Sequence, residues 1–509
     1  MEPAAPTLST VLSRACTGLD APLVRVETHL APGLPAFVIV GLPAAAVRES
    51  RERVRSAIIN SGFAFPAGRI TVNLAPDDLP KEGGRFDLPI AIGILAAGSQ
   101  IPAQRLPACE FYGELSLTGE LRETARLLPA LLAGVREPRE LIVPTANGLE
   151  SGLLRSHQVR HAQTLAQVCA ALGEGPPLSN SGHQSPHEPN APGSFDLREV
   201  RGQFAARRAL EIAAAGAHGL LMIGPPGAGK TLLAQCLPGL LPPLDAAQLL
   251  ETGAIASAAG ARPRIDRLPP FRHPQHTASA AALIGGGQQL RPGEASLAHH
   301  GVLFLDELPE FSRHALEALR EPLESGLVVL SRAKQVLEFP ARFQLLAAMN
   351  PCPCGFQGDA RRSCRCTVEQ VRRYRGRISG PLLDRIDMHV EVQALPPEHL
   401  LDRQAAEVEG SAVVARRVLG ARERQYVRQG KLNAHLDAAE RGAHCALPGQ
   451  GRALLARAID QLGLSARGCD RVLKLARTCA DLKGQESIAT EQLSEAIALR
   501  ALDRASPDG

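Results

Sequence analysis

An eight-residue segment, GPPGAGKT from Gly224 to Thr231, has the residue types and spacing of a loop that binds nucleotide phosphates. It follows an apolar run, Leu220 to Ile223, and precedes LLAQCLPGLL, which is typical of a helix start. Glycines allow backbone N–H groups to point at phosphate oxygens, lysine adds a positive charge, and threonine offers a hydroxyl to Mg²⁺. We therefore predict an ATP site whose binding residues are Gly224, Pro225, Pro226, Gly227, Ala228, Gly229, Lys230 and Thr231.

Two further apolar runs end on polar residues that suit phosphate transfer. GVLFLDE ends on Asp306 and Glu307, and LLAAMN ends on Asn350. Ligands of α/β proteins bind at the carboxyl ends of parallel strands, so we expect these side chains near the phosphate loop. Asp306 is the predicted Mg²⁺ ligand, Glu307 the general base, and Asn350 the group that orients the attacking water. A helix N-cap at the acidic pair and a turn at Asn350 before Pro351 are the alternatives.

Two arginine positions are predicted to read the γ-phosphate. Arg385, in SGPLLDRIDMHVEV, follows the loop, the acidic pair and the asparagine in the order of a ring ATPase, which predicts contact with a neighbouring subunit's phosphate. An ion pair with Asp384 or Asp387 is the alternative. In SARGCDRVLKLAR, Arg467 and Arg471 are four residues apart on one helix face. We prefer Arg467 as the contact to the phosphate of its own subunit.

Four cysteines are close together in the sequence. Cys352-Pro-Cys354 and Cys364-Arg-Cys366 are nine residues apart, and four thiolates suit tetrahedral Zn²⁺. One residue between paired cysteines is tighter than is usual for zinc, so free thiols and a redox role remain alternatives. The other seven of the eleven cysteines are scattered singly, unlike a secreted disulfide framework.

An arginine-rich segment follows the cysteines. Residues 361–377 hold seven arginines and one acidic residue, Glu369. Such a run is often only a solvated face, but in a ring it could face a channel and bind backbone phosphates without reading sequence. The predicted DNA contacts are Arg372, Arg373 and Arg375, with Tyr374 available for stacking on a base.

The chain divides at a segment dense in Pro, Gly, Ser and Asn. We predict an α+β domain over 1–172, a flexible linker over 173–195, an α/β core over 196–396 and a helical lid over 397–509. The net charge of +4 excludes a histone-like polycation, and 45% hydrophobic residues exclude disorder of the whole chain. No run of eighteen apolar residues occurs, which predicts a soluble, cytoplasmic chain with no membrane partner.

These motifs together resemble the ComM/YifB family of magnesium-chelatase-like AAA+ ATPases. The resemblance rests on GLPAAAVRESRERVRSAI, TVNLAPDDLPKEGGRFDLPIAIGILAA, DLREVRGQ, GPPGAGKT, PGEASLAHHGVLFLDELPEF, AAMNPCPCG and SGPLLDRID. It implies an α/β protein with a Lon-like, ribosomal-protein-S5-like N-terminal domain, an AAA+ P-loop core and a C-terminal helical lid domain. It also implies ATP and Mg²⁺ as cofactors, a hexameric homo-oligomer and, for ComM-like members, DNA branch migration in natural transformation.

Two positions depart from the family pattern. In FRHPQHTAS, Gln275 stands where a histidine is usual, which puts a metal or catalytic role of the pair in doubt, while His276 remains. KEGGRFDLP is similar in position to the Lon nucleophile loop but contains no serine; Arg85 or Phe86 stands there. Without a hydroxyl nucleophile Lys81 has no protease chemistry to support, so we predict a binding or assembly role for this domain.

The leading function is therefore an AAA+ ATPase ring that uses ATP hydrolysis to remodel or branch-migrate DNA, acting on branched or single-stranded DNA as a helicase or translocase. One alternative is a magnesium-chelatase-type motor for metal insertion into a porphyrin. Another is a ring that remodels a protein client.

Overall fold

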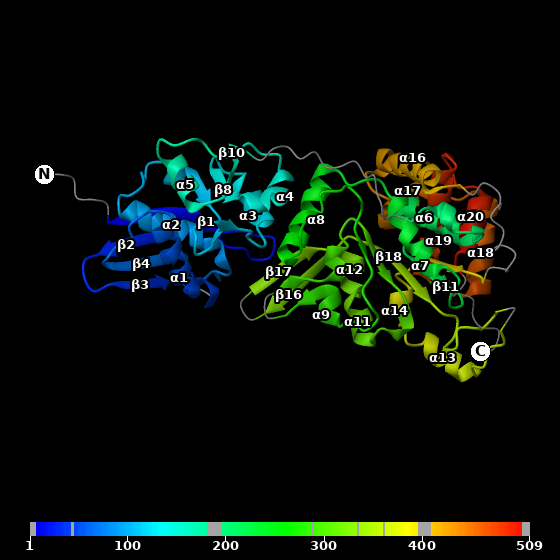
Figure 1. Cartoon of the computed structure of the whole chain (residues 1–509). Coiled ribbons are helices and arrows are strands. Elements are labelled where there is room, and N and C mark those ends of the chain that lie inside the picture. Colours follow the sequence, from blue (N-terminus) through cyan, green and yellow to red (C-terminus); the bar gives the residue numbers. More distant parts are fainter. Residues whose placement is uncertain are drawn as a thin grey trace.

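A computed structural model describes residues 7–41, 45–180, 195–287, 290–332, 335–359, 362–394 and 409–500. Figure 1 shows an N-terminal α/β domain in blue to cyan, a central domain with a parallel sheet in green to yellow, and C-terminal helices in orange to red. The predicted α/β class and the order of its three parts are confirmed. Over the described ranges, no helix is both long enough and apolar enough to cross a membrane.

The N-terminal domain is built on an eight-stranded mixed sheet in the order β10-β9-β8-β5-β1-β2-β4-β3. Helices α1 and α2 pack together, and α2 packs on β1 and β2 to close a core that includes Val26, Val72 and Ile92. The strands of the domain are β1 (Leu8–Arg14), β2 (Leu23–Ala31), β3 (Ala36–Val40), β4 (Arg69–Ala75), β5 (Cys109–Phe111), β6 (Glu114–Leu115), β7 (Leu121–Arg122), β8 (Glu140–Pro144), β9 (Val159–Ala162) and β10 (Ser179–Asn180), of which β6 and β7 form a separate pair. The helices are α1 (Ala45–Asn60), α2 (Asp87–Ala97), α3 (Leu128–Gly134), α4 (Gly148–Gly152) and α5 (Leu165–Leu172).

The sheet continues into the segment that composition assigns to the linker. Strand β10 pairs antiparallel with β9, with Ser179 opposite His161, and Leu178 beside it is buried. The first domain therefore extends to at least Asn180, beyond the predicted boundary at 172. Most of the remaining predicted linker, 181–194, lies outside the described residues, as does the predicted boundary at 396.

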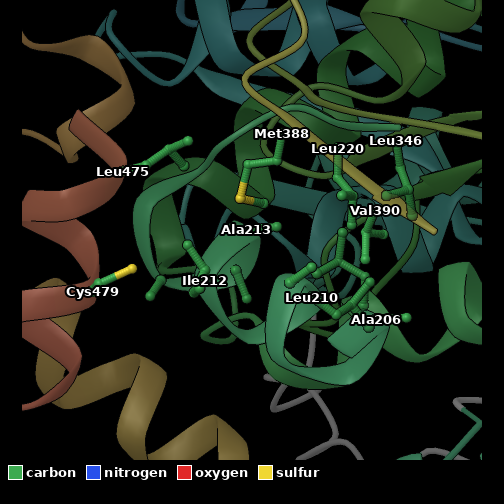
Figure 2. Packing of buried hydrophobic residues seen from close by; sticks show 14 of the residues in the cluster. Ala206, Leu210, Ile212, Ala213, Leu220, Leu346, Met388, Val390, Leu475 and Cys479 are labelled. Carbon is green, nitrogen blue, oxygen red and sulfur yellow. The ribbon is translucent and has the colours of Figure 1, made fainter. Parts of the chain in front are cut away.

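The central domain has a five-stranded parallel sheet in the order β12-β15-β18-β11-β19. The three apolar runs predicted as buried strands form β11, β15 and β18, and all their residues are buried. Alternate side chains enter two cores; Figure 2 shows one, where Leu220, Leu346 and Met388 meet α6. The sheet strands are β11 (Leu220–Ile223), β12 (Phe271–Arg272), β15 (Val302–Leu305), β18 (Gln344–Met349) and β19 (Met388–Glu391).

Short helices and two hairpins surround this sheet (Figure 1). The helices are α6 (Phe204–Gly216), α7 (Lys230–Cys236), α8 (Ala246–Ala259), α9 (Ala280–Ile284), α10 (Glu294–Leu297), α11 (Arg313–Ala318), α12 (Arg320–Ser325), α13 (Val368–Arg375) and α14 (Gly380–Leu383). One hairpin consists of β13 (Gly285–Gly286) and β14 (Arg291–Pro292), and the other of β16 (Leu327–Arg332) and β17 (Gln335–Pro340).

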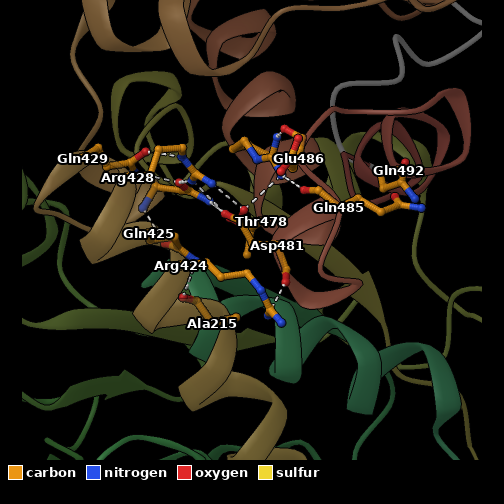
Figure 3. A network of polar contacts seen from close by, with 12 residues as sticks. Ala215, Arg424, Gln425, Arg428, Gln429, Thr478, Asp481, Gln485, Glu486 and Gln492 are labelled. Atoms are coloured by element: carbon orange, nitrogen blue, oxygen red, sulfur yellow. Dashed lines mark hydrogen bonds and ion pairs between the residues drawn. The ribbon is translucent and has the colours of Figure 1, made fainter.

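The C-terminal helices are joined to one another by a buried polar network, and one hydrogen bond links this network to the core. Asp481 accepts two hydrogen bonds from Arg428 at 2.6 and 2.9 Å and one from Arg477 at 3.0 Å, and Gln425 donates to the carbonyl of Ala215 on α6 (Figure 3). Removing one partner of a buried ion pair costs about 3–5 kcal/mol, so loss of Asp481 should destabilise the packing of these helices. The helices are α16 (Ser411–Gln429), α17 (Ala438–His444), α18 (Gly449–Leu462), α19 (Ala466–Leu482) and α20 (Thr490–Ala498).

The N-terminal domain packs against α8 of the core. Ser257 of α8 donates to a carboxylate oxygen of Glu150 at 2.6 Å and accepts from the N–H of Leu128 at 3.3 Å. Gly253, one turn earlier, lies so close to Leu128 that a Cβ there would meet its side chain at 3.0 Å. Burial at this contact raises the pKa of Glu150. The two domains therefore meet through a packed, hydrogen-bonded interface.

Candidate nucleotide site

The phosphate loop joins the carboxyl end of β11 to α7, as predicted. Gly227 and Gly229 have φ values of 76° and 89°, a left-handed backbone that residues with a Cβ rarely adopt. Gly224 is required for a different reason, since a side chain there would collide with the carbonyl of Val392. These glycines let the loop turn sharply and bring Lys230 back over it.

Lys230 and Asn350 lie together in the site. The ammonium of Lys230 donates to the carbonyls of Gly224 at 2.7 Å and Pro225 at 3.0 Å, and to Asn350 Oδ1 at 3.1 Å. Burial lowers the pKa of Lys230, while Asp306 and Glu307 oppose that shift. The ammonium is thus surrounded by oxygens, and phosphate oxygens offer it the same contact with a full negative charge.

The threonine of the loop meets the acidic strand end. Thr231 Oγ1 donates to Asp306 Oδ2 at 2.9 Å, and the other carboxylate oxygen of Asp306 accepts from the N–H of Glu307 at 2.9 Å. Glu307 follows with a left-handed backbone, φ 53°, and its side chain is 52% exposed. The structure therefore places a hydroxyl and a carboxylate side by side, with a second carboxylate free to reach solvent.

In its own chain Arg385 is held by residues other than those of this site. It donates to the carbonyl of Pro381 at 2.6 Å and forms an ion pair with Glu324 of α12, instead of the sequence alternatives Asp384 and Asp387. Its side chain is 11% exposed and borders a cavity of ≈370 Å³. The cavity is lined by Glu317, Arg320, Glu321, Glu324, Ser325 and Arg385.

The two candidate arginines of α19 differ in their surroundings. Arg467 lies exposed in the first turn of the helix, whose N-cap is Ser465. Arg471 is half-buried, and its guanidinium lies 3.7 Å from Asp387. Burial lowers the pKa of Arg471. Arg471 therefore has a structural partner, which leaves Arg467 as the candidate for phosphate contact.

Comparison with known proteins decides the family. Family models for the magnesium chelatase subunit ChlI match residues 26–147 and 196–400, and a model for the C-terminal part of that subunit matches 408–500. The chain is 49% identical to the YifB protein of Salmonella typhimurium over 501 residues and 48% identical to competence protein ComM of Haemophilus influenzae over 504 residues; each alignment covers 98% of both chains. This chain belongs to the ComM/YifB family of magnesium-chelatase-like proteins.

More distant similarity runs to the chelatase subunits themselves. The chloroplastic ChlI subunit of magnesium chelatase from Nicotiana tabacum is 24% identical over 218 residues, which cover 42% of this chain and 45% of the tobacco protein. As a ComM/YifB family member of the AAA+-like ATPase type, the chain carries its phosphate loop and acidic strand end inside the matched central region.

The four clustered cysteines of this family member converge in space. Sγ of Cys352 lies 3.4 Å from that of Cys354 and 3.6 Å from that of Cys364, and all four sulfurs are within 4.8 Å of one another. Zn–S bonds of about 2.3 Å in a tetrahedron place sulfurs about 3.8 Å apart. Backbone N–H groups of Arg365 and Phe356 lower the pKa of Cys354 to about 6, whereas burial and the neighbouring sulfurs raise the pKa of Cys364 and Cys366. The donor set therefore fits Zn²⁺.

The arginine-rich segment divides into exposed and anchored side chains. Arg372 and Arg373 are exposed on α13, and Arg373 lies 3.7 Å from Glu369. Arg375 is turned inward and donates to the carbonyl of Pro351 and the side chain of Gln357. Tyr374 is only 5% exposed and packs in the core, which raises its pKa to about 12. The predicted stacking of Tyr374 on a base is therefore wrong, because its ring is covered by protein.

A second group of metal-type ligands does not fit a metal. Glu251 of α8 accepts from His299 at 3.2 Å and from His300 at 2.7 Å. Nδ1 of His299 accepts from the N–H of Arg342, so its proton is on Nε2, where a metal would bind. Burial lowers the pKa of His299 to about 4, which keeps the ring neutral. The group links α8 to the residues before β15.

In the N-terminal domain, Lys81 and Arg85 have structural roles. Lys81 is fully buried and donates to the carbonyl of Pro76. Arg85 donates to the carbonyls of Ala125 and Arg126 at 2.7 and 3.1 Å. Within the described residues, neither side chain forms a hydrogen bond with a serine or threonine hydroxyl.

Two partners of site residues were not found from the sequence. Glu324 holds Arg385, and His276 Nδ1 lies 3.2 Å from Glu307 Oε2. The first carries no sequence signal, since the chain has many acidic residues. The second follows from strand pairing, because His276 lies four residues after Phe271–Arg272, which pairs with the strand before Glu307.

Proposed function

We propose that this chain is a cytoplasmic, Mg²⁺-dependent AAA+ ATPase that works as a homo-oligomeric ring, a hexamer, and uses ATP hydrolysis to remodel or branch-migrate DNA. The single observation that supports it best is the hydrogen-bonded set of Lys230, Asn350, Thr231 and Asp306, with Glu307 beside it. The proposed parts are a binding or assembly domain that the sequence places at 1–172 and that strand β10 extends to Asn180, a linker over the rest of 173–195, an ATPase core (196–396) and a helical lid (397–509).

Each site residue has a distinct proposed task in hydrolysis. The loop residues 224–231 bind the phosphates, and Lys230 exchanges carbonyl oxygens for phosphate oxygens. Glu307 takes the proton of the attacking water, which Asn350 orients. Arg467 contacts the γ-phosphate of its own subunit, and Arg385 that of the neighbour.

Thr231 and Asp306 suit Mg²⁺, the ion that would bridge the phosphates. A hydroxyl and a carboxylate 2.9 Å apart are the hard oxygen ligands that this ion prefers, directly or through water. When bound, the ion neutralises charge that develops on the phosphate oxygens. Asp306 is held for that task by the N–H of Glu307.

DNA is the proposed substrate of the motor. The exposed arginines of α13 offer charge for backbone phosphates without base-specific geometry. A relative with 98% mutual coverage is named a competence protein. The alternative of metal insertion has the support of the family models of the chelatase subunit, but the pairwise similarity to the tobacco chelatase subunit covers only 42% of this chain.

The deciding experiment is an ATPase assay of the full chain with single-stranded, duplex, forked and four-way DNA. We expect turnover to rise severalfold with branched or single-stranded DNA, and junctions to be moved in an ATP-dependent manner. Turnover that depends on a porphyrin would support the chelatase-type motor instead. Turnover that responds to neither would point to a protein client.

The proposed DNA-binding arginines of α13 lead to a second prediction. Replacing both Arg372 and Arg373 with Ala should weaken DNA binding and lower the slope of log affinity against log salt by about 1–2, since each lost arginine removes one phosphate contact. The measurement is fluorescence anisotropy over a salt series. Arg452 and Arg457, two exposed arginines of α18, form the matched control pair and should leave the slope unchanged. Equal slopes in the α13 variant and wild type would contradict DNA binding by Arg372 and Arg373.

We also propose structural zinc at Cys352, Cys354, Cys364 and Cys366. The purified protein should contain close to one zinc per chain by elemental analysis, and Cys354→Ser should lose it because three thiolates hold zinc far less tightly. Cys469→Ser, which changes a half-buried thiol of α19, should keep the metal. A folded, metal-free wild-type protein prepared without chelators would exclude the site.

A further inference from the structure

The turn that carries the first two clustered cysteines, residues 352–355, lies against the phosphate loop. Gly355 has a left-handed backbone, φ 84°, and its N–H donates to the carbonyl of Cys352 at 2.9 Å, which closes the turn. A Cβ on Gly355 would lie 2.7 Å from Cδ and 2.9 Å from Cγ of Pro226. Because such distances are too short for a Cβ, only glycine lets the turn touch the ring of Pro226. We call residues 352–355 the cysteine turn.

The cysteine turn also lies beside Asn350 of the nucleotide site. A Cβ on Gly355 would lie 3.9 Å from Cγ of Asn350, and Asn350 Oδ1 accepts from the ammonium of Lys230 at 3.1 Å. Cys352 and Gly355 are buried, whereas Pro226 is exposed on its other side. The turn is therefore a packed support under one side of an otherwise exposed loop.

The cysteine turn is joined to the second pair of cysteines through sulfur. Sγ of Cys364 lies 3.6 Å from Sγ of Cys352 and 3.7 Å from Sγ of Cys354, and the N–H of Cys354 donates to Sγ of Cys366 at 3.4 Å. Among the described residues, no backbone–backbone hydrogen bond links residues 352–355 to residues 364–366. The position of the turn therefore depends on the four sulfurs, and Zn²⁺ at the proposed site would crosslink them.

A support of this kind changes the free energy of nucleotide binding. Ordering a loop around phosphates costs conformational entropy, and Gly227 and Gly229 make this loop intrinsically flexible. A neighbour that restricts Pro226 in advance lowers that cost. Coupling between two sites acts equally in both directions, so bound nucleotide must in turn stabilise the cysteine turn.

We propose that the cysteine turn braces the phosphate loop through the contact of Gly355 with Pro226, so that joining of the four sulfurs and binding of ATP favour each other. This inference rests on the nucleotide site proposed above. The four cysteines take no part in the chemistry of hydrolysis; they are positioning residues that act through Pro226.

The first test is alkylation of the full chain by iodoacetamide, followed by mass spectrometry of its peptides. Alkylation requires the turn to open, so a non-hydrolysable ATP analogue with Mg²⁺ should slow it at the four clustered cysteines about 5–50-fold. Cys16, a half-buried thiol of the N-terminal domain, should react at the same rate with and without analogue. Lys230→Ala should show little protection at the same analogue concentration, because the loop has lost its positive charge.

The second test is a double-mutant cycle on the affinity for a fluorescent ATP analogue. Cys354→Ser should weaken binding about 5–50-fold, whereas Cys16→Ser should leave it unchanged. Pro226→Ala removes the ring atoms that touch Gly355. In the Pro226→Ala background, Cys354→Ser should therefore cost much less affinity than it does in wild type.

The outcomes separate this inference from the site on which it rests. An analogue that binds wild type but leaves the alkylation of the four cysteines unchanged would overturn the brace, as would additive losses in the cycle or wild-type affinity in Cys354→Ser. If Cys354→Ser fails to fold, the alkylation of wild type decides alone. Wild-type protein that does not bind the analogue would instead overturn the proposed nucleotide site, and this inference with it.

Discussion

Glu307→Gln should lower ATP turnover by about 10³-fold, within the 10²–10⁴ range that a general base supplies. Glutamine keeps the size of the side chain, but it cannot take a proton from water. Lys230 and Thr231, the residues proposed to bind the phosphates, are untouched. ATP binding should therefore persist while hydrolysis stops.

Two measurements check this result. Steady-state phosphate release gives turnover, and a fluorescent ATP analogue gives affinity, which should stay within about threefold of wild type. Glu310→Gln is the matched control, because Glu310 lies three residues further on and pairs with Arg377 at 2.8 Å. It should retain nearly full turnover. A Glu307→Gln protein with more than about a tenth of wild-type turnover would show that another group is the base.

The central strands could be predicted because they are buried on both faces. Parallel strands covered on both sides have continuous apolar sequences, and the runs ending at Ile223, Leu305 and Met349 are of this kind. The carboxyl ends of these strands lie at one edge of the sheet, which predicts that Lys230, Asp306 and Asn350 lie close together. The hydrogen bond from Lys230 to Asn350 follows from that adjacency.

Strand β10 could not be predicted from hydrophobicity. Ser179 and Asn180 are both exposed, and they join the sheet through backbone hydrogen bonds alone. A segment of this kind has the composition of a linker even where it completes a sheet. The buried residue beside it, Leu178, was the one local sign that the domain continues.

Tyr374 was misinterpreted although its signal was present. Val371, Tyr374 and Ile378 are buried and follow the i, i+3, i+7 spacing of one helix face. The surrounding arginines drew attention to charge, whereas the spacing indicates a helix with one face against the core. The same helical spacing places Arg372 and Arg373 on the exposed face of the helix, away from the buried ring of Tyr374.

Ion-pair partners that lie far apart in the chain could not be assigned from the sequence. Arg385 and Glu324 lie on different elements, and with 56 basic and 52 acidic residues an ion pair cannot be assigned by composition. The Asp384 and Asp387 alternatives were local and failed for Arg385, because Asp387 is used by Gly219 and Arg471. Only the folded arrangement distinguishes these pairs.

Arg385→Ala should reduce ATP turnover about 10³-fold or more, the effect of an arginine that reaches a neighbour's phosphate. In its own chain Arg385 contacts Glu324 and the carbonyl of Pro381, and the catalytic contact that we propose is made to a second subunit. The carboxylate of Glu324 is then the resting partner that a phosphate replaces. Glu324→Gln keeps the guanidinium and should retain most of the turnover.

A mixing experiment tests contact across subunits. Lys230→Ala subunits cannot hydrolyse ATP but supply an intact Arg385, whereas Arg385→Ala subunits have an intact nucleotide site. In equal mixtures, half of the intact sites face a subunit with Arg385, so turnover should recover to roughly a quarter of wild type in a head-to-tail ring. Because each variant alone is inactive, recovery can come only from a shared site. Mixtures that stay inactive after subunit exchange would place the role of Arg385 within its own subunit.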